Sequence, residues 1–134
     1  AYFMRIMQTT RHGQPFDAAA VRTESLACAA WLQTELERPA QGRWDKTVVV
    51  THFGPSLRSA DPRYGQQPGT ASFCNADDEL IARADLWLHG HLHCRHDYRV
   101  ARAGRAPTRV VCNARGLEAK NEPLGHDGLL TLDI

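Results

Sequence analysis

The chain has 134 residues, enough for one domain with its own core, and we expect residues 1–134 to form a single domain. Hydrophobic residues make up 43% and charged residues 23%, as in an ordinary globular protein, and the net charge is +1. There is no basic stripe for a nucleic acid, and no apolar run approaches the roughly 20 residues of a membrane span. We therefore expect neither a nucleic-acid nor a membrane partner.

The cysteines are scattered and form no C-x-x-C pair: Cys28, Cys74, Cys94 and Cys112. In a chain of this length, that pattern indicates reduced thiols rather than a disulfide framework. The first residues also lack the apolar segment of a signal peptide. We expect a cytoplasmic protein.

The first part of the chain predicts one long helix. Residues 2–8 are apolar enough for a short strand or an extended arm, and residues 11–16 read as a loop because they contain glycine and proline. Asp17 is a suitable N-cap for a helix that runs toward Arg38, where Pro39 ends it.

The rest of the chain alternates strands with loops. A β-branched run predicts a buried strand over 47–51, and the Gly-, Pro- and Arg-rich segment 53–75 predicts a long functional loop. Acidic residues open a short helix over 77–84. Further strands are predicted at 86–88, 96–102, 108–112 and 129–134, with the middle two forming a hairpin. This order of elements predicts a mixed, layered α/β fold.

Histidines follow two of the predicted strands. His52 follows the first, and His89, His91 and His93 follow the second at alternate positions. Neutral imidazole is the commonest metal-ligand side chain, so this spacing predicts a metal or phosphate site. Gly90 can supply a turn with positive φ that aims the two later histidines. A single histidine after a core strand can equally be structural.

Other histidine motifs fit less well. The H-x-H-x-D-H motif of metallo-β-lactamases fails because Cys94 and Arg95 stand where it needs Asp and His, and a zinc finger lacks its paired cysteines. Cys94 is a possible soft ligand, but such a residue is more often a small core side chain. Residues 11–13 (Arg-His-Gly) together with His52 resemble the histidine phosphatases, but the segment between the two histidines is too short for that family.

The two histidine segments together resemble the calcineurin-like metallophosphoesterases, which are dinuclear-metal phosphatases and phosphodiesterases. In that family a strand-end histidine precedes a Pro-Ser loop, here residues 52–56, and a G-H-x-H turn follows, here residues 90–93. Residues 108–116 and 121–123 are also similar to the closing strands of bacterial members. The resemblance covers nearly the whole chain and implies the C-terminal half of an α/β/β/α sandwich.

This resemblance implies that His52 and His91 bind one divalent metal ion and that His93 binds a second. Mn, Fe or Zn would suit such ligands better than Ca. Two ions about 3.5–4 Å apart would clamp a phosphate ester and activate a water for attack on phosphorus. The implied activity is metal-dependent hydrolysis of a phosphate-ester substrate, with segment 53–75 shaping the choice of substrate.

The sequence lacks the family's N-terminal motifs. D-x-H, G-D and G-N-H-[D/E] are absent, and with them the bridging carboxylate, an Asn ligand and a further histidine; Phe53 also stands where a histidine is common. We expect the chain to be a C-terminal half with partial or no metal occupancy and little or no activity by itself. A half-sandwich also exposes the surface that its other half covers, so we expect self-association.

Two alternatives stay open. The chain can be a catalytically inactive short paralogue that serves as a metal-binding or protein-interaction module. It can also hold a mononuclear metal site assembled between subunits from His52, His91 and His93. Candidate phosphate contacts, which more often are solvated loop charges, are Arg58, Arg63 and Arg115.

Overall fold

The computed structural model describes residues 8–122 and 125–134. The strand or arm predicted over 2–8 lies, except for Gln8, outside the described residues. The chain separates into two compact units, Ala1–Arg38 and Pro39–Ile134, and each is described by itself. Helices and strands occur together, which confirms the mixed α/β class. That the whole chain forms a single domain stays a prediction.

The first unit begins with a short hairpin where the sequence predicts only a loop. β1 (Thr10–Arg11) and β2 (Gln14–Pro15) pair antiparallel. Between them His12 and Gly13 have φ values of 51° and 76°, and two successive left-handed residues are typical of the tightest hairpin turns. The turn residues were recognised, but not the pairing of their flanks.

α1 (Ala18–Glu37) confirms the predicted helix and both of its ends. The Asp17 carboxylate accepts a hydrogen bond from the Ala20 N–H at 2.9 Å, which satisfies one of the free donors at the helix start. Arg38 leaves the helix in an extended conformation, as a residue before proline prefers. Neither α1 nor any other described helix combines the length and the apolar character needed to cross a membrane.

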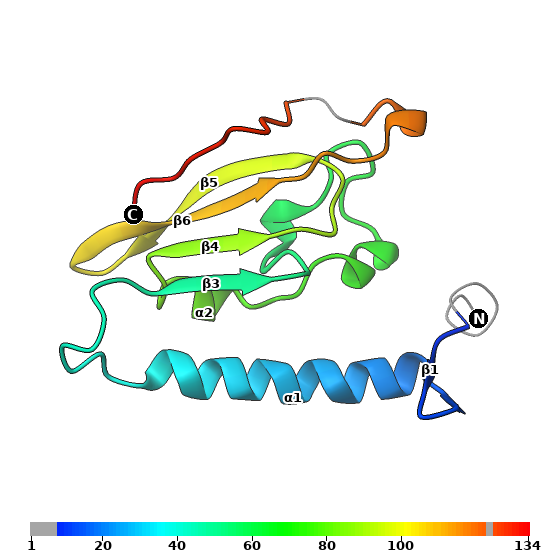
Figure 1. The fold of residues 1–134 in the computed structure, drawn as a ribbon, viewed down its shortest axis with the longest axis horizontal. Helices are drawn as coiled ribbons and strands as arrows, with labels where there is room; N and C mark the ends of the chain where they lie inside the picture. The colour runs from blue at the N-terminus through cyan, green and yellow to red at the C-terminus, as the bar shows by residue number, and fades with distance from the viewer. Residues whose placement is uncertain (1–7, 123–124) are drawn as a thin grey trace. The chain divides into compact units, whose positions relative to one another are not determined.

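A four-stranded sheet organises the second unit (Figure 1). Its strands are β3 (Val48–Thr51), β4 (Leu86–His89), β5 (Arg95–Arg102) and β6 (Arg105–Asn113). They lie in the order β3-β4-β6-β5, in which the first three are parallel and β5 is antiparallel to β6. The carboxyl ends of β3, β4 and β6 therefore meet at one edge of the sheet, where their arrowheads point in Figure 1.

The inner strands β4 and β6 carry much of the core. Trp87 and Val110 are fully buried, and the Trp87 indole N–H donates to Thr51 Oγ1 at 3.0 Å. β3 is less buried than predicted, since Val49 is buried whereas Val48 and Val50 are exposed. Alternating burial means that only one face of this edge strand packs on the core.

The helix predicted over 77–84 is shorter in the structure, because α2 spans only Asp78–Ile81. The Thr108 hydroxyl, fully buried on β6, bonds to the carbonyl oxygens of Ile81 and Ala84 at 2.9 and 2.7 Å. These bonds supply partners for carbonyls that a helix end leaves free. They tie the end of α2 to the sheet.

The predicted loop 53–75 is a closed segment with two short helices. Gly54 and Cys74 form an isolated bridge near its ends, and the 3-10 helices η2 (Leu57–Ser59) and η3 (Pro68–Ser72) lie between them. A Cβ atom on Gly54 would lie within 3.2 Å of three side chains, so the close approach at this bridge requires glycine.

The closing strand predicted over 129–134 does not form, and this prediction is wrong. In the described sheet β6 already has β4 on one side and β5 on the other. Asn113 at the end of β6 instead holds Asp127: its Nδ2 donates to the Asp127 carbonyl at 2.7 Å, and its Oδ1 accepts from the Asp127 N–H at 3.1 Å. The apolar pattern alone does not produce a strand, and residues 129–134 pair with neither free edge of the described sheet, β3 or β5.

Candidate metal centre

The two histidine segments meet at the carboxyl edge of the sheet. The parallel register places Thr51 opposite His89, so the residues that follow β3 and β4 emerge side by side. The Gly90 N–H donates to the His52 carbonyl oxygen at 3.1 Å, which extends the contact by one residue beyond the strands. The fold thus brings His52 and His91 together.

The imidazoles of His52 and His91 form a close pair. Their ring centroids lie 4.6 Å apart, with the planes inclined by 47°. With metal–nitrogen bonds of about 2.1 Å, two imidazoles on one ion have ring centres roughly 4.5 Å apart at a ligand angle of 90° and roughly 5.2 Å apart at the tetrahedral angle. Burial lowers the pKa of His91, as does the neighbouring His52, and this favours the neutral form that a metal ion needs. The pair fits joint coordination of one ion.

His91, not Gly90, has the left-handed backbone after β4. Its φ is 63°, whereas Gly90 has no positive φ, so the prediction for this turn is wrong. The His91 ring is held by a hydrogen bond from Nε2 to the Ser72 carbonyl at 3.2 Å and by stacking on Phe73 at 5.0 Å. Because a carbonyl oxygen only accepts, the proton lies on Nε2 and Nδ1 is left as the ligand atom.

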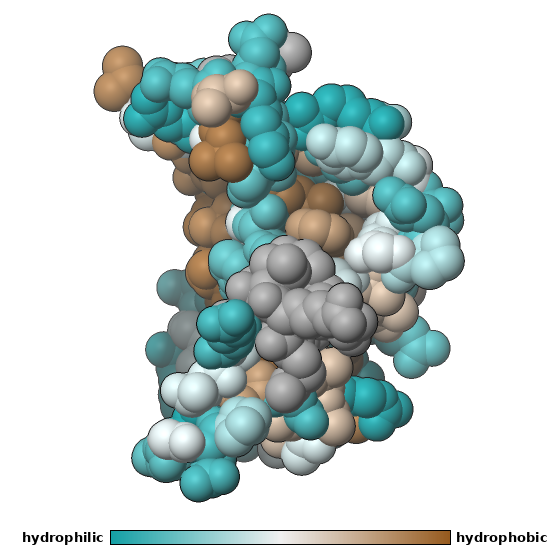
Figure 2. Space-filling model, turned by 90° about the vertical axis from the view of Figure 1, so that its right-hand side faces the viewer, coloured by the Kyte–Doolittle hydropathy of each residue, from teal (hydrophilic) through white to brown (hydrophobic). Residues whose placement is uncertain are grey.

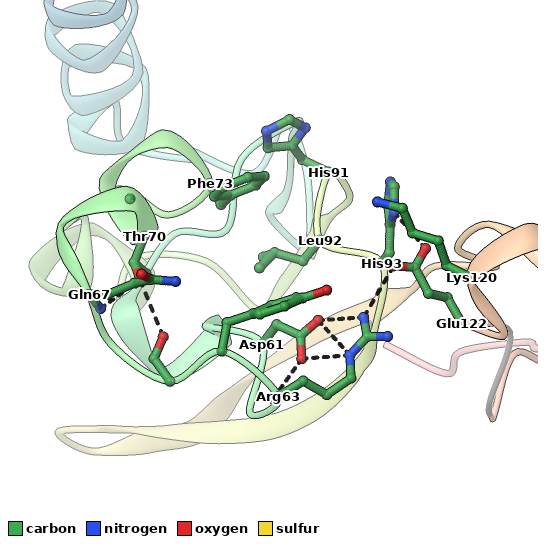
Figure 3. Close-up of a pocket in the computed structure, with 13 residues that line it drawn as sticks. Asp61, Arg63, Gln67, Thr70, Phe73, His91, Leu92, His93, Lys120 and Glu122 are labelled. Carbon is green, nitrogen blue, oxygen red and sulfur yellow. Dashed lines mark hydrogen bonds and ion pairs between the residues drawn. The ribbon is translucent and has the colours of Figure 1, made fainter. Parts of the chain in front are cut away.

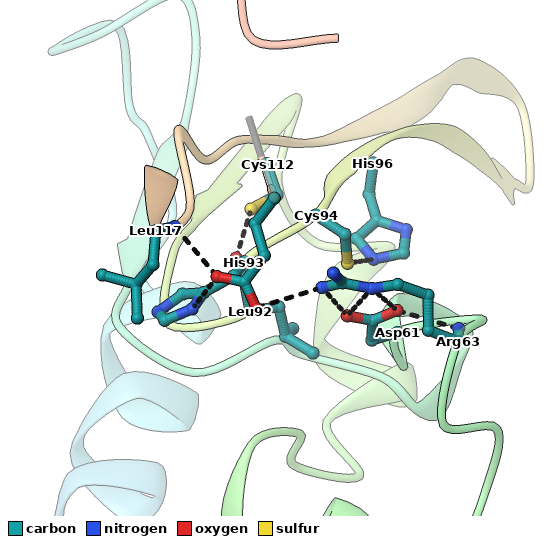
Figure 4. Close-up of polar contacts among 9 residues, drawn as sticks. Asp61, Arg63, Leu92, His93, Cys94, His96, Cys112 and Leu117 are labelled. Carbon is teal, nitrogen blue, oxygen red and sulfur yellow. Dashed lines mark hydrogen bonds and ion pairs between the residues drawn. The ribbon is translucent and has the colours of Figure 1, made fainter. Parts of the chain in front are cut away.

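His93 is paired with a buried carboxylate. Its Nδ1–H donates to Glu122 Oε2 at 2.8 Å, and the same oxygen accepts the Leu117 N–H at 2.9 Å (Figure 4). The Glu122 side chain is only 3% exposed. Burial raises the pKa of Glu122, but the hydrogen bonds from Leu117 and His93 outweigh it and hold that pKa below its usual value. Glu122 is therefore ionised, and Nε2 of His93 makes no hydrogen bond to another described residue.

Arg63 joins this carboxylate to a second one. Its guanidinium bonds to both carboxylate oxygens of Asp61, the shortest contact being 2.6 Å, and lies 3.5 Å from Glu122 Oε1. The hydrogen bond from Arg63 lowers the pKa of Asp61. Arg63 was a candidate phosphate contact, and in this structure its charge is shared between two carboxylates.

The other two candidate arginines also have partners. Arg58 lies 4.3 Å above the Tyr98 ring and donates to a backbone carbonyl, and Arg115 forms an exposed ion pair with Glu118 at 2.8 Å. Neither lines the cavity described below. Their observed contacts are those of surface side chains.

His89 belongs to a separate polar layer. It is buried, and its Nε2 lies 3.0 Å from Ser59 Oγ, which also bonds to the Tyr98 hydroxyl at 2.9 Å. The ring of His96 lies 6.1 Å from that of His89, and its Nε2 is 3.1 Å from Cys94 Sγ. Burial lowers the pKa of both histidines and raises that of Cys94 to about 12. These groups are neutral at pH 7, as structural groups of a core would be.

A cavity of about 410 Å³ opens beside His91 and His93 (Figure 3). Phe73 and Leu92 contribute apolar walls, and Lys120 lies beside His93. In the space-filling view, brown hydrophobic surface is visible among teal hydrophilic residues on this side of the molecule (Figure 2). Its polar lining comes from the following side chains: Asp61, Arg63, Tyr64, Gln67, Thr70, Lys120 and Glu122. Lys120 forms no ion pair with another described residue within 4 Å, but its charge helps to lower the pKa of Glu122.

The ligand set is incomplete by itself. Within residues 8–122 and 125–134, no three His, Cys, Asp or Glu side chains are grouped so that they could hold a metal ion. The predicted ligands form a pair, His52 and His91, and a separate His93. Both carboxylates that line the cavity are engaged, by Arg63 and by His93. The assignment of these three histidines as metal ligands stays a prediction.

Glu122 and Asp61 are parts of the site that the sequence does not predict. Glu122 is 29 positions from His93 along the chain, and Asp61 lies within the Gly- and Pro-rich segment. Neither residue is three, four or two positions from a predicted ligand, the separations that place side chains together on a helix or a strand. The only signal was that residues 121–123 are similar to a stretch of the resembled family.

Comparison with known proteins adds no relative: no family model, no curated protein and no solved structure matches this chain.

Proposed function

We propose that this chain supplies the histidine side of a dinuclear metallophosphoesterase centre that hydrolyses a phosphate ester. The observation that carries the proposal is the His52–His91 pair, with ring centroids 4.6 Å apart at the carboxyl edge of a parallel sheet. In this proposal His52 and His91 hold one divalent ion and His93 holds the other. The mixed sheet would then be the C-terminal half of the family's two-sheet sandwich.

The backbone of His91 supports a functional role. A residue other than glycine, asparagine or aspartate in the left-handed region raises the free energy of the folded state by roughly 1–2 kcal/mol. Here φ is 63° and the side chain is a histidine. Such strain is common at ligand sites, where the side chain is needed in one direction. Gly90, the adjacent residue, would have adopted this conformation without strain.

The protonation of the ring nitrogens is also favourable. His91 donates through Nε2 to a carbonyl, and His93 donates through Nδ1 to a carboxylate, so each ring keeps one unprotonated nitrogen. Histidine ligands of metals usually make such a second hydrogen bond. A divalent ion at this position would supply charge for binding phosphate and would make a water molecule more acidic.

The cavity suggests where a substrate would lie. A phosphate held near His91 and His93 would be close to Lys120, whose cation attracts anions. The ester group would extend into the cavity along Phe73 and Leu92, which suit an apolar or aromatic group. Segment 53–75 would then determine which ester fits, because Phe73 belongs to it.

The carboxylate ligands are the missing part of this proposal. The motifs D-x-H, G-D and G-N-H-[D/E] do not occur in these 134 residues. We propose that the remaining ligands come from a polypeptide segment outside these 134 residues. The chain by itself should show little or no turnover of an aryl phosphate with Mn²⁺.

Titration of the chain with Zn²⁺ and Mn²⁺ in a calorimeter tests the metal site. We expect binding that weakens at least tenfold in His52→Ala and in His91→Ala, and that is unchanged in His126→Ala, which removes an exposed histidine away from the pair. Equal affinities in all four proteins would contradict the site. Aryl phosphate hydrolysis should appear only when a segment with the three motifs is joined or added, and its absence there would contradict the activity.

A further inference from the structure

We infer that Glu122 is a positioning residue for His93: it keeps the proton on Nδ1 and so presents Nε2 to whatever the site binds. The inference rests on the proposed function for the identity of that ligand. The hydrogen bond between Glu122 and His93, and the ring orientation that it fixes, follow from the geometry alone. The pair joins the turn after β4 to the segment that follows β6.

The contact between Glu122 and His93 allows only one arrangement of protons. The distance from Nδ1 to Oε2 is 2.8 Å, within the range of a charge-assisted hydrogen bond. An ionised carboxylate has no proton to give, so His93 must donate through Nδ1. When the imidazole is neutral, Nε2 is then the nitrogen with the lone pair.

Glu122 is itself held firmly on the other side. Its Oε2 also accepts the Leu117 N–H, and its side chain is almost fully buried. Gly116 has a φ of 70°, and a Cβ atom there would lie 2.5 Å from the Cβ of Glu122 and 3.2 Å from the His93 carbonyl oxygen. The backbone at Gly116 therefore passes tightly between the two residues, and only glycine leaves room for the pair.

Arg63 and Asp61 keep the carboxylate charged without removing it from His93. A buried carboxylate without a partner would be strongly unfavourable, and Arg63 lies 3.5 Å from its Oε1. Arg63 is shared with Asp61, so the three groups together carry a net negative charge (Figure 4). That charge favours a donated proton from His93 and a cation beyond its ring.

Nitrogen NMR of the histidine side chains at pH 8, without metal, tests the inference. We expect the Nδ1–H form of His93 in the native chain and a majority Nε2–H form in Glu122→Ala. Glu122→Gln keeps a carbonyl oxygen that can accept from Nδ1, so it should retain the native form. Glu118→Ala is the matched control, because Glu118 lies in the same segment but pairs only with exposed Arg115.

Two results would overturn the inference. One is an Nε2–H form of His93 in the native chain, and the other is a native-like His93 spectrum in Glu122→Ala. If Glu122→Ala does not fold, Gly116→Ala is the second variant, since its Cβ atom would displace Glu122. Gly104→Ala controls for the backbone, because Gly104 has a φ of 66° with no atom within 4 Å of the added Cβ. Gly116→Ala should shift the His93 signals, and Gly104→Ala should not.

Metal titration separates this inference from the proposed function. If both hold, Zn²⁺ affinity should fall about 10- to 100-fold in Glu122→Ala, as expected when the carboxylate partner of a ligand histidine is removed. If the NMR result is as expected but His93→Ala leaves Zn²⁺ affinity unchanged, the role of His93 as a metal ligand is contradicted and the role of Glu122 in fixing the ring is supported. A native His93 spectrum in Glu122→Ala contradicts the inference whatever the metal result.

Discussion

Individual histidines of this chain have different environments. His52 is exposed at the sheet edge, His91 and His93 are half-buried around a cavity, and His89 and His96 lie in a polar layer with Ser59 and Tyr98. The His52 ring is exposed to solvent. The rings of His91 and His93 are each oriented by one hydrogen bond, to Ser72 and to Glu122. The last two have hydrogen-bond partners within the protein, and His89 is buried whereas His96 is partly exposed. Satisfied ring nitrogens are the pattern of a structural histidine.

The buried histidines predict that the protein loses stability in mild acid. Burial lowers the pKa of His89 and His96 in the folded chain, and that of His91 as well. Asp61 and a hydrogen bond from the His96 ring to the Ser59 backbone act on the pKa of His96 in the opposite direction, and Cys94 beside it is neutral. Above about pH 6.5 these histidines are neutral in both the folded and the unfolded chain. As the pH falls below that value, they are protonated first in the unfolded chain, which favours unfolding. Each unit of pKa difference corresponds to about 1.4 kcal/mol lost as pH falls through the folded pKa.

Urea unfolding between pH 8 and pH 5 measures this effect. The carboxylates with lowered pKa contribute only at lower pH, near and below about 4, so they do not obscure this window. His96→Gln should flatten the pH dependence, and His126→Gln should leave it as in the native chain. A free energy of unfolding that stays constant from pH 8 to pH 5 would show that the two histidines are not desolvated as described.

At the level of elements, the sheet is tied together at the end opposite the histidines. The Asp85 carboxylate precedes β4 and accepts the Thr47 N–H before β3, at 2.8 Å. It also accepts from Arg102 at the end of β5, at 2.8 Å. The Arg102 side chain is only 5% exposed and bonds to the Ala84 carbonyl as well. One carboxylate therefore connects three strands and neutralises a buried cation.

Removing this carboxylate should destabilise the protein strongly. In Asp85→Ala we expect the free energy of unfolding to fall by about 3 kcal/mol, because a buried arginine loses its charge partner. Asp97→Ala is the matched comparison, since Asp97 forms a similar ion pair with Arg109 on the same sheet but both side chains are about one-third exposed. There the expected loss is at most about 1 kcal/mol. Equal losses in a urea titration would contradict the role given to Asp85.

For the whole molecule, the open edge of the sheet predicts self-association. β3 is an edge strand in the order β3-β4-β6-β5, and Val50 on it is 71% exposed. An unpaired edge with exposed apolar side chains is a template for pairing with a second copy. Light scattering after gel filtration should give a mass above that of one chain, and Val50→Lys should shift it toward the monomer. A monomeric native chain would count against the expected half-sandwich surface.

The sequence by itself determined features that depend on near neighbours. Asp17 and Pro39 set the ends of α1, a β-branched run set β3, and a short apolar run set β4. The strand-end histidines followed from these two strands. Each of these features depends on the conformational preference of a few consecutive residues, and the folded chain adopts that preferred conformation. The metal assignment went further than this, since it came from a family resemblance and stays a prediction.

Only the tertiary structure decided which distant groups meet. Residues 129–134 have an apolar, strand-like pattern but form no strand, because the path of the chain after β6 does not pair them with either free edge of the described sheet. The left-handed turn falls on His91 instead of Gly90, since Ser72 and Phe73 hold that ring in place. Glu122 reaches His93 only because the segment after β6 folds back over the turn after β4. Such contacts depend on the path of the whole chain, and residue spacing carries no record of that path.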